Sequence, residues 1–488
     1  LNATDLANML ATQEVTIQTG AGADTITVAQ SFSWTSSHRL TLQADLNVSF
    51  QAPITVAGPG SLIIQYATGG AGDLIFFPGA SVTFWDMSST FSLQGQAYKL
   101  EPSLEQLTTD LNIAGNKGNF ALANDFDETG QTFTRAPLNG EFGVTLEGAG
   151  HTIANLVVHL PKTGQCAGLF DELFGSVSDL NVTNADVSTI HHNTNAGIIN
   201  GCGNGALAHV FTSGNVTVGT DSFGGGLSGD SGSIRDSSSA ANVTAPSSAN
   251  GTSFIGGLVG ENDGAGQWPI TNSSASGNIT GGDNTIAGGL VGFNAPGAGI
   301  RFSHASGNVT VGNQSRTRAG AGGLVGVNYA AISQSFATGN VSGGSSTNVG
   351  GLVGYGTGGV NSYATGSALC TTSCSVGGML GSTFSKGGGT GTSYSTASVG
   401  GGSGALVGGV IGDALGNSAA SDTYWDLDTS GVSNPSQGAG NEANLPGLTG
   451  LSDTALKSAL PAGFDPAVWG QKRKINHGYP YLLNNPPQ

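Results

Sequence analysis

Charge is what this sequence has least of. Asp, Glu, Lys and Arg make up 9% of its 488 residues, against about 25% in an average soluble protein. Lys and Arg number 14 and Asp and Glu 31, which gives a net charge of −17, and the one basic run is 472–474. Affinity for nucleic acid and for anionic lipid comes mainly from clustered cations. The composition therefore excludes a nucleic-acid partner and disfavours docking on a membrane surface.

Long apolar runs are also missing. No stretch approaches the roughly 18 residues that a membrane-spanning helix needs, so no membrane insertion is predicted. Apolar residues nevertheless make up 38% of the chain, more than disordered chains contain. The 83 glycines lack the three-residue period of collagen. The chain is therefore expected to fold around a core.

Glycine is abundant, and this decides the class of secondary structure. Each glycine inside a helix costs roughly 1 kcal/mol, whereas turns use glycine readily. A chain rich in Gly, Ser and Asn and poor in Lys and Glu favours short strands joined by turns. We predict an all-β fold with few short helices, expected at Asp5–Leu10 (capped by Thr4), Leu104–Leu111 and Ser452–Leu460.

A five-residue block of the form Gly-Gly-aliphatic-aliphatic-Gly recurs through the second half of the chain. Its intervals, with those of weaker upstream copies, run from 27 to 34 residues. A unit of this length with two or three short apolar stretches predicts one coil of a right-handed parallel β-helix, in which each coil buries its apolar face against its neighbours. A propeller is the alternative, but about 30 residues are few for a four-stranded blade. The strong copies are Gly256–Gly260, Gly288–Gly292, Gly322–Gly326, Gly350–Gly354, Gly377–Gly381 and Gly408–Gly412.

The repeats divide the chain into four expected segments. Residues 1–100 alternate with period two and lack the glycine block, which predicts irregular coils. Residues 101–165 form a junction with a short helix and entry coils, and 166–430 form the repeat array. Residues 431–488 have the atypical composition of a terminal cap, which would cover the open end of the rod.

The four cysteines are too few and too badly spaced for a zinc site. We predict disulfides instead, with Cys370 and Cys374 closing a small loop and Cys166 and Cys202 tying neighbouring coils. Such disulfides would place the protein in an oxidising compartment. Four free thiols in a reducing cell are the alternative.

The repeat carries a resemblance to a known family. The GGLVG block followed by S-[YFH]-A-[ST]-G-N-[VI], as in Gly288–Gly292 and 303–309, resembles the GLUG repeat of filamentous-haemagglutinin-type bacterial surface proteins. Segments 139–156, 424–431 and 478–482 resemble the stretches that precede and close such arrays. The resemblance implies a secreted, cell-surface β-helix, commonly exported with an outer-membrane secretion partner. It does not imply one activity, and an adhesin is the leading hypothesis. The chain departs from the family pattern at Asp171-Glu172 and at Glu147.

Clustered carboxylates offer the candidate catalytic chemistry. Asp125, Asp127 and Glu128 form the densest group, and Asp171 and Glu172 follow one or two coils later. Pairs of carboxylates act as acid and base in sugar hydrolases, and in lyases they hold Ca²⁺. The alternative is a set of acidic loop residues at a segment junction.

Metal and cofactor binding receive little support from the sequence. Asp422, Asp426 and Asp428 offer oxygen ligands for Ca²⁺, but they lack the glycine and terminal Glu of an EF-hand loop, and a capping turn is the alternative. His191-His192 has no third ligand nearby. We expect no metal and no cofactor, with Ca²⁺ as the one exception left open.

Aromatic residues offer the candidate binding site. Trp268, Phe293, Tyr329 and Tyr355 each follow a glycine block by a few residues and are expected to line one face of the rod, where sugar rings stack on aromatic faces. The sequence thus predicts a monomeric, secreted β-helix that binds a glycan or a surface protein or serves as a stalk. The alternative is an extracellular polysaccharide hydrolase or lyase.

Overall fold

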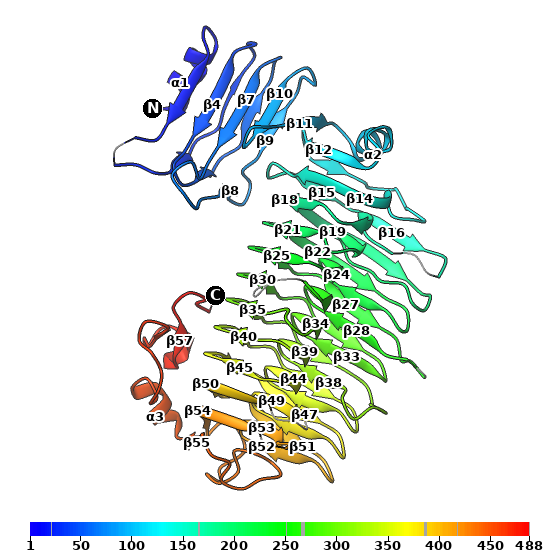
Figure 1. The fold of residues 1–488 in the computed structure, drawn as a ribbon, viewed down its shortest axis with the longest axis vertical. Helices are drawn as coiled ribbons and strands as arrows, with labels where there is room; N and C mark the ends of the chain where they lie inside the picture. Colours follow the sequence, from blue (N-terminus) through cyan, green and yellow to red (C-terminus); the bar gives the residue numbers. More distant parts are fainter. Residues whose placement is uncertain are drawn as a thin grey trace.

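The computed structural model describes residues 1–20, 22–163, 166–249, 251–264, 269–384, 388–416 and 418–487. The chain forms an elongated parallel β-solenoid of about 15 turns with about 29 residues per turn (Figure 1). The predicted all-β parallel β-helix is therefore confirmed, and a propeller is excluded. The residue boundaries of the four expected segments stay predictions.

In the N-terminal coils, three stacks of parallel strands enclose a core of apolar side chains. Their strands stack in exact register, for example Val48 on Leu74 and Phe50 on Phe76. The core holds large apolar side chains that are almost fully buried, among them Trp34, Phe50 and Phe84. The strands are β1 (Val15–Gln18), β4 (Arg39–Gln43), β7 (Ser61–Gln65) and β10 (Thr90–Leu93) in one sheet, β2 (Ile26–Val28), β5 (Val48–Phe50) and β8 (Leu74–Phe76) in the second, and β3 (Phe32–Trp34), β6 (Ile54–Val56) and β9 (Val82–Phe84) in the third.

Each coil of the repeat array runs through three stacks of strands, which we call the G, F and E stacks. The G stack contains β23 (Phe223–Gly225), β28 (Ser253–Gly256), β33 (Thr285–Gly288), β38 (Gly320–Gly322), β43 (Asn348–Gly350), β48 (Ser375–Gly377) and β52 (Leu406–Gly408). The F stack contains the first half of β14 (Leu138–Glu147), then β17 (Phe170–Leu173), β20 (Asn200–Cys202), β24 (Ser228–Ser231), β29 (Val259–Asn262), β34 (Val291–Asn294), β39 (Val325–Asn328), β44 (Val353–Gly356), β49 (Leu380–Thr383) and β53 (Ile411–Asp413).

The E stack completes each coil with short strands. Its first members are β11 (Gln96–Glu101), β12 (Lys117–Leu122), β13 (Phe126–Asp127), β15 (Thr152–Ala154), β16 (Val157–Leu160), β18 (Ser176–Ser178), β19 (Asn181–Thr189), β21 (Ala206–Ala208), β22 (Phe211–Thr217), β25 (Ser233–Arg235), β26 (Ser238–Ser239) and β27 (Asn242–Ala245). Its later members are β30 (Ile270–Thr271), β31 (Ser274–Ala275), β32 (Ile279–Gly281), β35 (Ile300–Arg301), β36 (His304–Ala305), β37 (Val309–Thr310), β40 (Ile332–Ser333), β41 (Phe336–Ala337), β42 (Val341–Gly343), β45 (Gly359–Val360), β46 (Tyr363–Ala364), β47 (Ser367–Cys370), β50 (Gly389–Ser395), β51 (Ser398–Gly401), β54 (Ala419–Asp426) and β55 (Leu448–Leu451).

The glycine block exists because the G and F strands of each coil pack backbone against backbone. A Cβ placed on Gly292 would lie 2.7 Å from the carbonyl oxygen of Gly260 and 2.7 Å from the amide nitrogen of Ile255. One on Gly288 would lie 2.0 Å from the carbonyl oxygen of Val291. These separations are far below van der Waals contact, so only glycine fits. The aliphatic pair between the glycines points into the core, where Leu290 and Val291 are fully buried.

The second repeat motif forms polar ladders along the rod. The Oγ atom of Ser303 accepts a hydrogen bond from the amide of Ser273 at 3.2 Å, and that of Ser335 accepts from the amide of Ser303 at 3.1 Å. The Asn278 side chain likewise accepts from the amide of Asn308 at 3.1 Å. Each turn thereby satisfies a backbone N–H of the neighbouring coil, which explains why the same polar residues recur.

The α-helices among the described residues are short. Helix α2 (Leu104–Ile113) begins after Ser103 and α3 (Asp453–Ser458) after Ser452, and both caps accept a backbone hydrogen bond, so these two predicted helices are confirmed. Helix α1 (Ala3–Leu10) is also present, but its cap is Asn2 and the prediction of Thr4 was wrong. Asn2 accepts from the amide of Asp5, so the helix begins earlier.

The C-terminal residues fold back along the rod, as Figure 1 shows for the segment from α3 to β57 (Tyr481–Leu482). β57 pairs with β56 (Trp469–Gly470), and a short 3₁₀ helix spans Asn476–Gly478. The segment covers a column of stacked rings from the E stack, Phe336, Tyr363, Tyr394 and Tyr424. Its last described residues reach Ser303, whose carbonyl accepts from Asn485 at 3.1 Å.

Candidate ligand-binding face

Outward-facing residues of the F stack form a row along the rod. In one stretch of this row Asp230 lies in register with Glu261, and Glu261 in register with Phe293. The row continues to Val327 and Tyr355 on the next two coils. Consecutive members are therefore about 4.8 Å apart, the spacing of neighbouring strands.

Aromatic rings run beside and within this row. The centroid distances are 5.5 Å from Phe223 to Phe254, 5.4 Å from Phe254 to Phe293, 5.7 Å from Phe293 to Tyr329, and 4.7 Å from Tyr329 to Phe384. We call these five rings the aromatic stripe. Tyr329 is 36% exposed and the four phenylalanines are half-buried. The stripe is thus a continuous set of rings that solvent can reach.

The structure sorts the four aromatic residues that the sequence singled out. Phe293 and Tyr329 belong to the stripe. Tyr355 was expected to be exposed, but it is 4% exposed because it packs edge-on against Phe384, with centroids 5.3 Å apart. Trp268 lies outside the described residues.

Three residues of the stripe were missed, namely Phe223, Phe254 and Phe384. Two of them carried a signal, because Phe223 and Phe254 each stand four residues before the first aliphatic of their glycine block. They belong to the G stack, where Phe223 packs on Phe254, and the contact between the G and F stacks brings Phe254 beside Phe293. Phe384 carried a different signal, because it follows Met379, the first aliphatic of its block, by five residues, just as Tyr329 follows Leu324.

Three carboxylates, which we call the acidic group, lie at one end of the stripe: Asp230, Glu261 and Asp263. Burial, followed by the charges of Asp263 and Glu261, raises the pKa of Asp230 to about 7. Burial and the charge of Asp263 also raise the pKa of Glu261. None of the ion pairs among the described residues involves any of the three. The group is therefore a local concentration of uncompensated negative charge.

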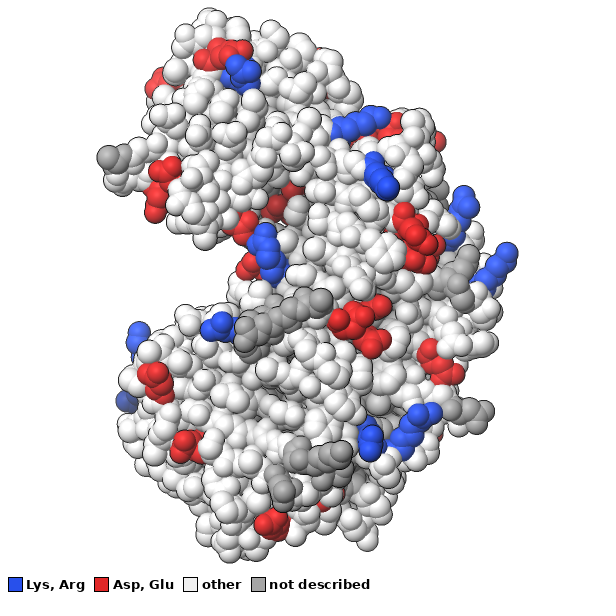
Figure 2. All heavy atoms as spheres, in the orientation of Figure 1, with Lys and Arg blue, Asp and Glu red and all other residues white. Residues whose placement is uncertain are grey.

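The two ends of the stripe differ in charge. Burial raises the pKa of Tyr355, and the charge of Arg318 partly opposes that shift, which places a cation near the Phe384 end. Figure 2 shows how sparse charge is on the face of the molecule that it draws, where most atoms are uncharged and the acidic residues gather in small groups. The stripe is therefore acidic at one end and has a cation, Arg318, near the other.

In the first predicted acidic cluster, Asp125 and Asp127 hold local turns, whereas Glu128 faces a cavity. Asp125 accepts from the ring Nδ1 of His151 at 2.9 Å, and this hydrogen bond is the main cause of its lowered pKa. Asp127 accepts from the amide of Thr129 at 3.0 Å and from Asn155 at 2.8 Å. Burial raises the pKa of Glu128, which lines a surface cavity of about 600 Å³ beside the start of α2.

The second predicted pair lies on a different stack. Asp171 and Glu172 belong to β17 of the F stack, where Asp171 accepts from the amide of Cys166 at 3.1 Å. Glu172 is in register with Glu141 and Cys202, and burial raises its pKa. No hydrogen bond or ion pair joins these two residues to Asp125, Asp127 or Glu128, all of which the structure describes. The structure therefore shows no direct contact between the two groups, and a shared catalytic role stays a prediction.

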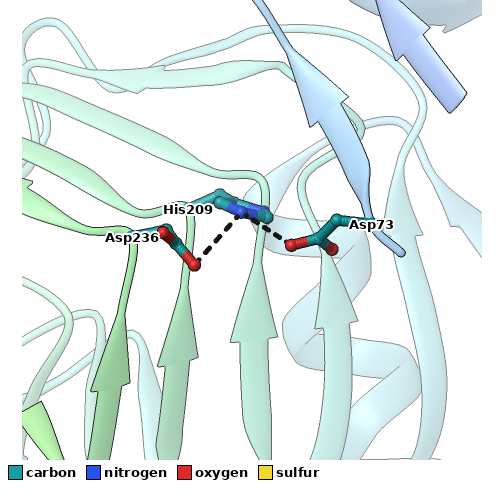
Figure 3. Close-up of side chains that lie close together, drawn as sticks. All are labelled: Asp73, His209 and Asp236. Carbon is teal, nitrogen blue, oxygen red and sulfur yellow. Dashed lines mark ion pairs between the residues drawn. The ribbon is translucent and has the colours of Figure 1, made fainter. Parts of the chain in front are cut away.

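A charged cluster that the sequence did not reveal joins the N-terminal coils to the repeat array. Figure 3 shows His209 between Asp73, from the loop before β8, and Asp236, from the repeat array. The ring Nε2 lies 3.2 Å from Asp73 and 3.7 Å from Asp236, and Nδ1 lies 3.2 Å from Asp179. Arg235 lies 2.7 Å from Asp73 and 3.1 Å from Asp236.

These groups resemble a metal site only in composition. Burial alone would lower the pKa of His209, but hydrogen bonds with Asp179 and Asp73 outweigh it and raise the pKa to about 10. Burial likewise acts to raise the pKa of Asp73, yet His209 and Arg235 lower it to about 2. A protonated imidazole is not a metal ligand, and Arg235 already supplies positive charge to both Asp73 and Asp236. We therefore interpret the cluster as an ionic contact between segments.

The candidate Ca²⁺ ligands near the C-terminus are engaged by protein groups. Asp426 is fully buried and accepts from the amide of Asp428 at 2.9 Å and from the Tyr479 hydroxyl at 3.0 Å. Asp428 accepts from the amide of Asp453, the first residue of α3. These contacts fit the capping-turn alternative, and they hold the C-terminal segment on the rod. Among the described residues, no hydrogen bond or ion pair connects Asp422 or His191-His192 to Asp426 or Asp428.

The cysteines lie in two close pairs. Cys166 and Cys202 form a disulfide with Cα atoms 5.7 Å apart, and Cys370 and Cys374 form one with Cα atoms 6.5 Å apart. The first connects neighbouring coils of the F stack and the second closes a five-residue loop. Among the described residues no helix is both long and apolar enough to cross a membrane.

Comparisons with known proteins find weak structural similarities. No protein-family model matches the chain, and no curated protein does. A solved Bacteroides ovatus structure, provisionally described as an immunoglobulin A1 protease, is 16% identical over 80% of this chain and 93% of its own, with a TM-score of 0.40. A structure described as IgA1 protease is 18% identical over 55% of this chain and 21% of its own, also with a TM-score of 0.40. Similarities this weak carry no functional argument.

Proposed function

We propose that this protein is an extracellular, surface-displayed β-helix that binds an extended polysaccharide along the aromatic stripe. The observation that carries the proposal is the series of solvent-accessible rings from Phe223 to Phe384, in which each centroid lies within 5.7 Å of the next. Two predicted properties support display outside the cell, namely the resemblance to GLUG-repeat surface proteins and the two disulfides. Export with an outer-membrane secretion partner is part of this proposal.

The stripe suits a polymer better than a small ligand. Aromatic faces bury the apolar faces of sugar rings, and the neighbouring carboxylates accept hydrogen bonds from hydroxyl groups. Because the rings repeat with the coils, a chain laid along the rod contacts several of them at once. Each contact is weak, and several contacts on one chain add up to useful affinity.

The test is binding to a panel of soluble polysaccharides by affinity electrophoresis and calorimetry. We expect at least one polymer to bind, and the double variant Phe293→Ala/Tyr329→Ala to lose about tenfold or more in affinity. Trp85→Ala is the matched control, because Trp85 is a 72% exposed aromatic far from the stripe in sequence and on the N-terminal coils. Binding to none of the polymers, or equal loss in the control, would refute the proposal.

Polysaccharide cleavage on the same face is a second candidate, favoured by one observation. Asp230 keeps its proton up to a pH of about 7 beside two further carboxylates, as a general acid in a glycosidase must. Release of reducing ends from a bound polymer, abolished by Asp230→Asn with binding retained, would establish it. Absence of new reducing ends from a polymer that binds would leave the protein a binding module.

A further inference from the structure

We infer that the polysaccharide bound by the stripe carries ammonium groups, as in a polymer of amino sugars, and that the acidic group recognises them. This inference rests on the proposed function and narrows its ligand class. It follows from where the charges lie relative to the rings.

The first step is the position of the acidic group. Glu261 is the direct neighbour of Phe293 in the outward row, and Asp230 is the next residue along that row. Phe254 contacts Phe293 from the G stack at 5.4 Å between centroids. A ligand lying on Phe254 and Phe293 therefore has carboxylates directly beside its rings.

The second step is that no Lys or Arg in the described part of the chain forms an ion pair with these carboxylates. The shifts in the pKa of Asp230 and Glu261 come from burial and from one another and Asp263, and no Lys or Arg contributes to either. One oxygen of Asp230 is buried and has no hydrogen-bond partner among the described residues. Partly buried carboxylates without a counter-ion favour a cation, and they repel a polymer that carries uronate or sulfate.

The third step is the chemistry of the rings themselves. An ammonium ion within about 6 Å of an aromatic centroid is attracted to the face of the ring, and combined aromatic and acidic surroundings are how proteins recognise ammonium groups. Phe254, Phe293 and Tyr329 supply such faces, and the acidic group supplies the charge. At the other end Arg318 disfavours a second ammonium, so the ligand's cationic group is expected at the end of the stripe near Phe254.

The experiment compares three oligosaccharides of one length and one backbone by calorimetry: a free-amine form, an N-acetyl form and an N-trimethyl form whose charge is permanent. We expect the free-amine and N-trimethyl forms to bind at least tenfold more tightly than the N-acetyl form. The double variant Glu261→Gln/Asp263→Asn should reduce that ratio to near one. The charge-matched control Asp45→Asn/Glu105→Gln, which changes two acidic residues outside the stripe, should keep the ratio.

The outcomes separate the two proposals. Equal binding of the three forms, or tighter binding of the N-acetyl form, would overturn the inference and leave polysaccharide binding standing. A preference that the control variant loses as fully as the test variant would also overturn it, because the attraction would then come from overall charge. Binding of no form, together with binding of none of the polymers in the wider panel, would refute the proposed function itself.

Discussion

The N-terminal coils and the repeat array build the same solenoid in two different ways. Residues 1–100 contain 9 glycines, whereas residues 251–350 contain 24. The N-terminal coils space their sheets with large side chains such as Trp34, Phe50 and Phe84. The repeat array lets the G and F stacks touch through their backbones, with glycine as the only residue that fits. The same solenoid is therefore stabilised by large buried side chains in the first region and by close backbone packing in the second.

The contrast also explains where the binding face lies. Because two strands of each coil pack without side chains between them, residues at the edges of those strands are forced outward side by side. Phe254 and Phe293 meet in this way, although they are far apart in sequence. The N-terminal coils lack this arrangement, and their fully buried Phe50 stacks on the partly buried Phe76 at the edge of the core. An exposed stripe is a by-product of glycine packing.

The largest expected effect is loss of a core ring in the N-terminal coils. Phe50→Ala removes a fully buried side chain that stacks on Phe76 at 5.0 Å, and we expect a loss of about 4 kcal/mol in the free energy of unfolding. Thermal unfolding combined with limited proteolysis should show that the N-terminal coils open first. Phe77→Ala is the control, since Phe77 is 45% exposed. A similar loss in the control would contradict the account.

The matching change in the repeat array adds a single carbon. Gly292→Ala places a Cβ 2.7 Å from two backbone atoms, and we expect a loss of about 3 kcal/mol, since backbone on both sides prevents relaxation. Urea denaturation measures it. Gly143→Ala is the control, because a Cβ there meets nothing within 4 Å. If both substitutions prove equally mild, the glycine block has no packing role.

The ionic contact between the two regions should contribute less to the free energy of unfolding than the packing contacts above, and its contribution should depend on pH. We expect Asp73→Asn to lower the free energy of unfolding by about 2 kcal/mol, because it leaves His209 and Arg235 with fewer partners. The lowered pKa of Asp73, about 2, makes its contribution vanish as pH falls from about 4 towards 2. The raised pKa of His209, about 10, makes its contribution decline as pH rises from 6.5 to about 10. The difference between wild type and variant should thus be greatest between about pH 4 and 6.5.

Urea titrations of wild type, Asp73→Asn and the exposed control Asp24→Asn across this range check the prediction. A difference that does not change with pH would show that the contact is not ionic. A control variant that behaves like Asp73→Asn would point to general charge effects.

The smallest expected effect concerns Glu101, a carboxyl next to Asp110 of α2. Glu101 is fully buried near Asp110, and burial followed by the charge of Asp110 raises its pKa to about 7. A carboxyl whose pKa is raised on folding stabilises least above that pKa, so the wild type should lose stability as pH rises from about 4.5 to 7. Glu101→Gln should gain about 1 kcal/mol at about pH 8 relative to about pH 5. Chemical denaturation at the two pH values measures it, and a gain in the exposed control Glu105→Gln would argue against the explanation.

Much of the fold was predictable because its signals are local and repeated. The spacing of blocks such as Gly288–Gly292 predicted the coils, and Ser103 and Ser452 predicted two helix starts. The candidate site was predictable only in part. Phe293 and Tyr329 lie on the face expected of them, but the burial of Tyr355 depends on contact with Phe384, which spacing along the chain does not encode. Asp125 and Glu172 were candidates for one catalytic site, and the structure places Asp125 directly before β13 of the E stack and Glu172 in β17 of the F stack.

The charged cluster around His209 could not be predicted from the sequence for a related reason. Asp73 and Arg235 are separated by 162 residues, and neither stands in a motif. They meet only because the N-terminal coils are docked against the repeat array, which brings Arg235 within 2.7 Å of Asp73. The periodicity of the sequence predicts how successive coils pair, but it does not predict how the N-terminal coils dock against the repeat array.

The most direct test of the central claim is a crystal structure of the protein with a free-amine oligosaccharide. The account predicts sugar rings lying along the rod on Phe254, Phe293 and Tyr329, with an ammonium group within hydrogen-bond distance of Glu261 or Asp263. An oligosaccharide bound elsewhere, for example in the junction beside Asp73, with the stripe bare at saturating ligand, would contradict it.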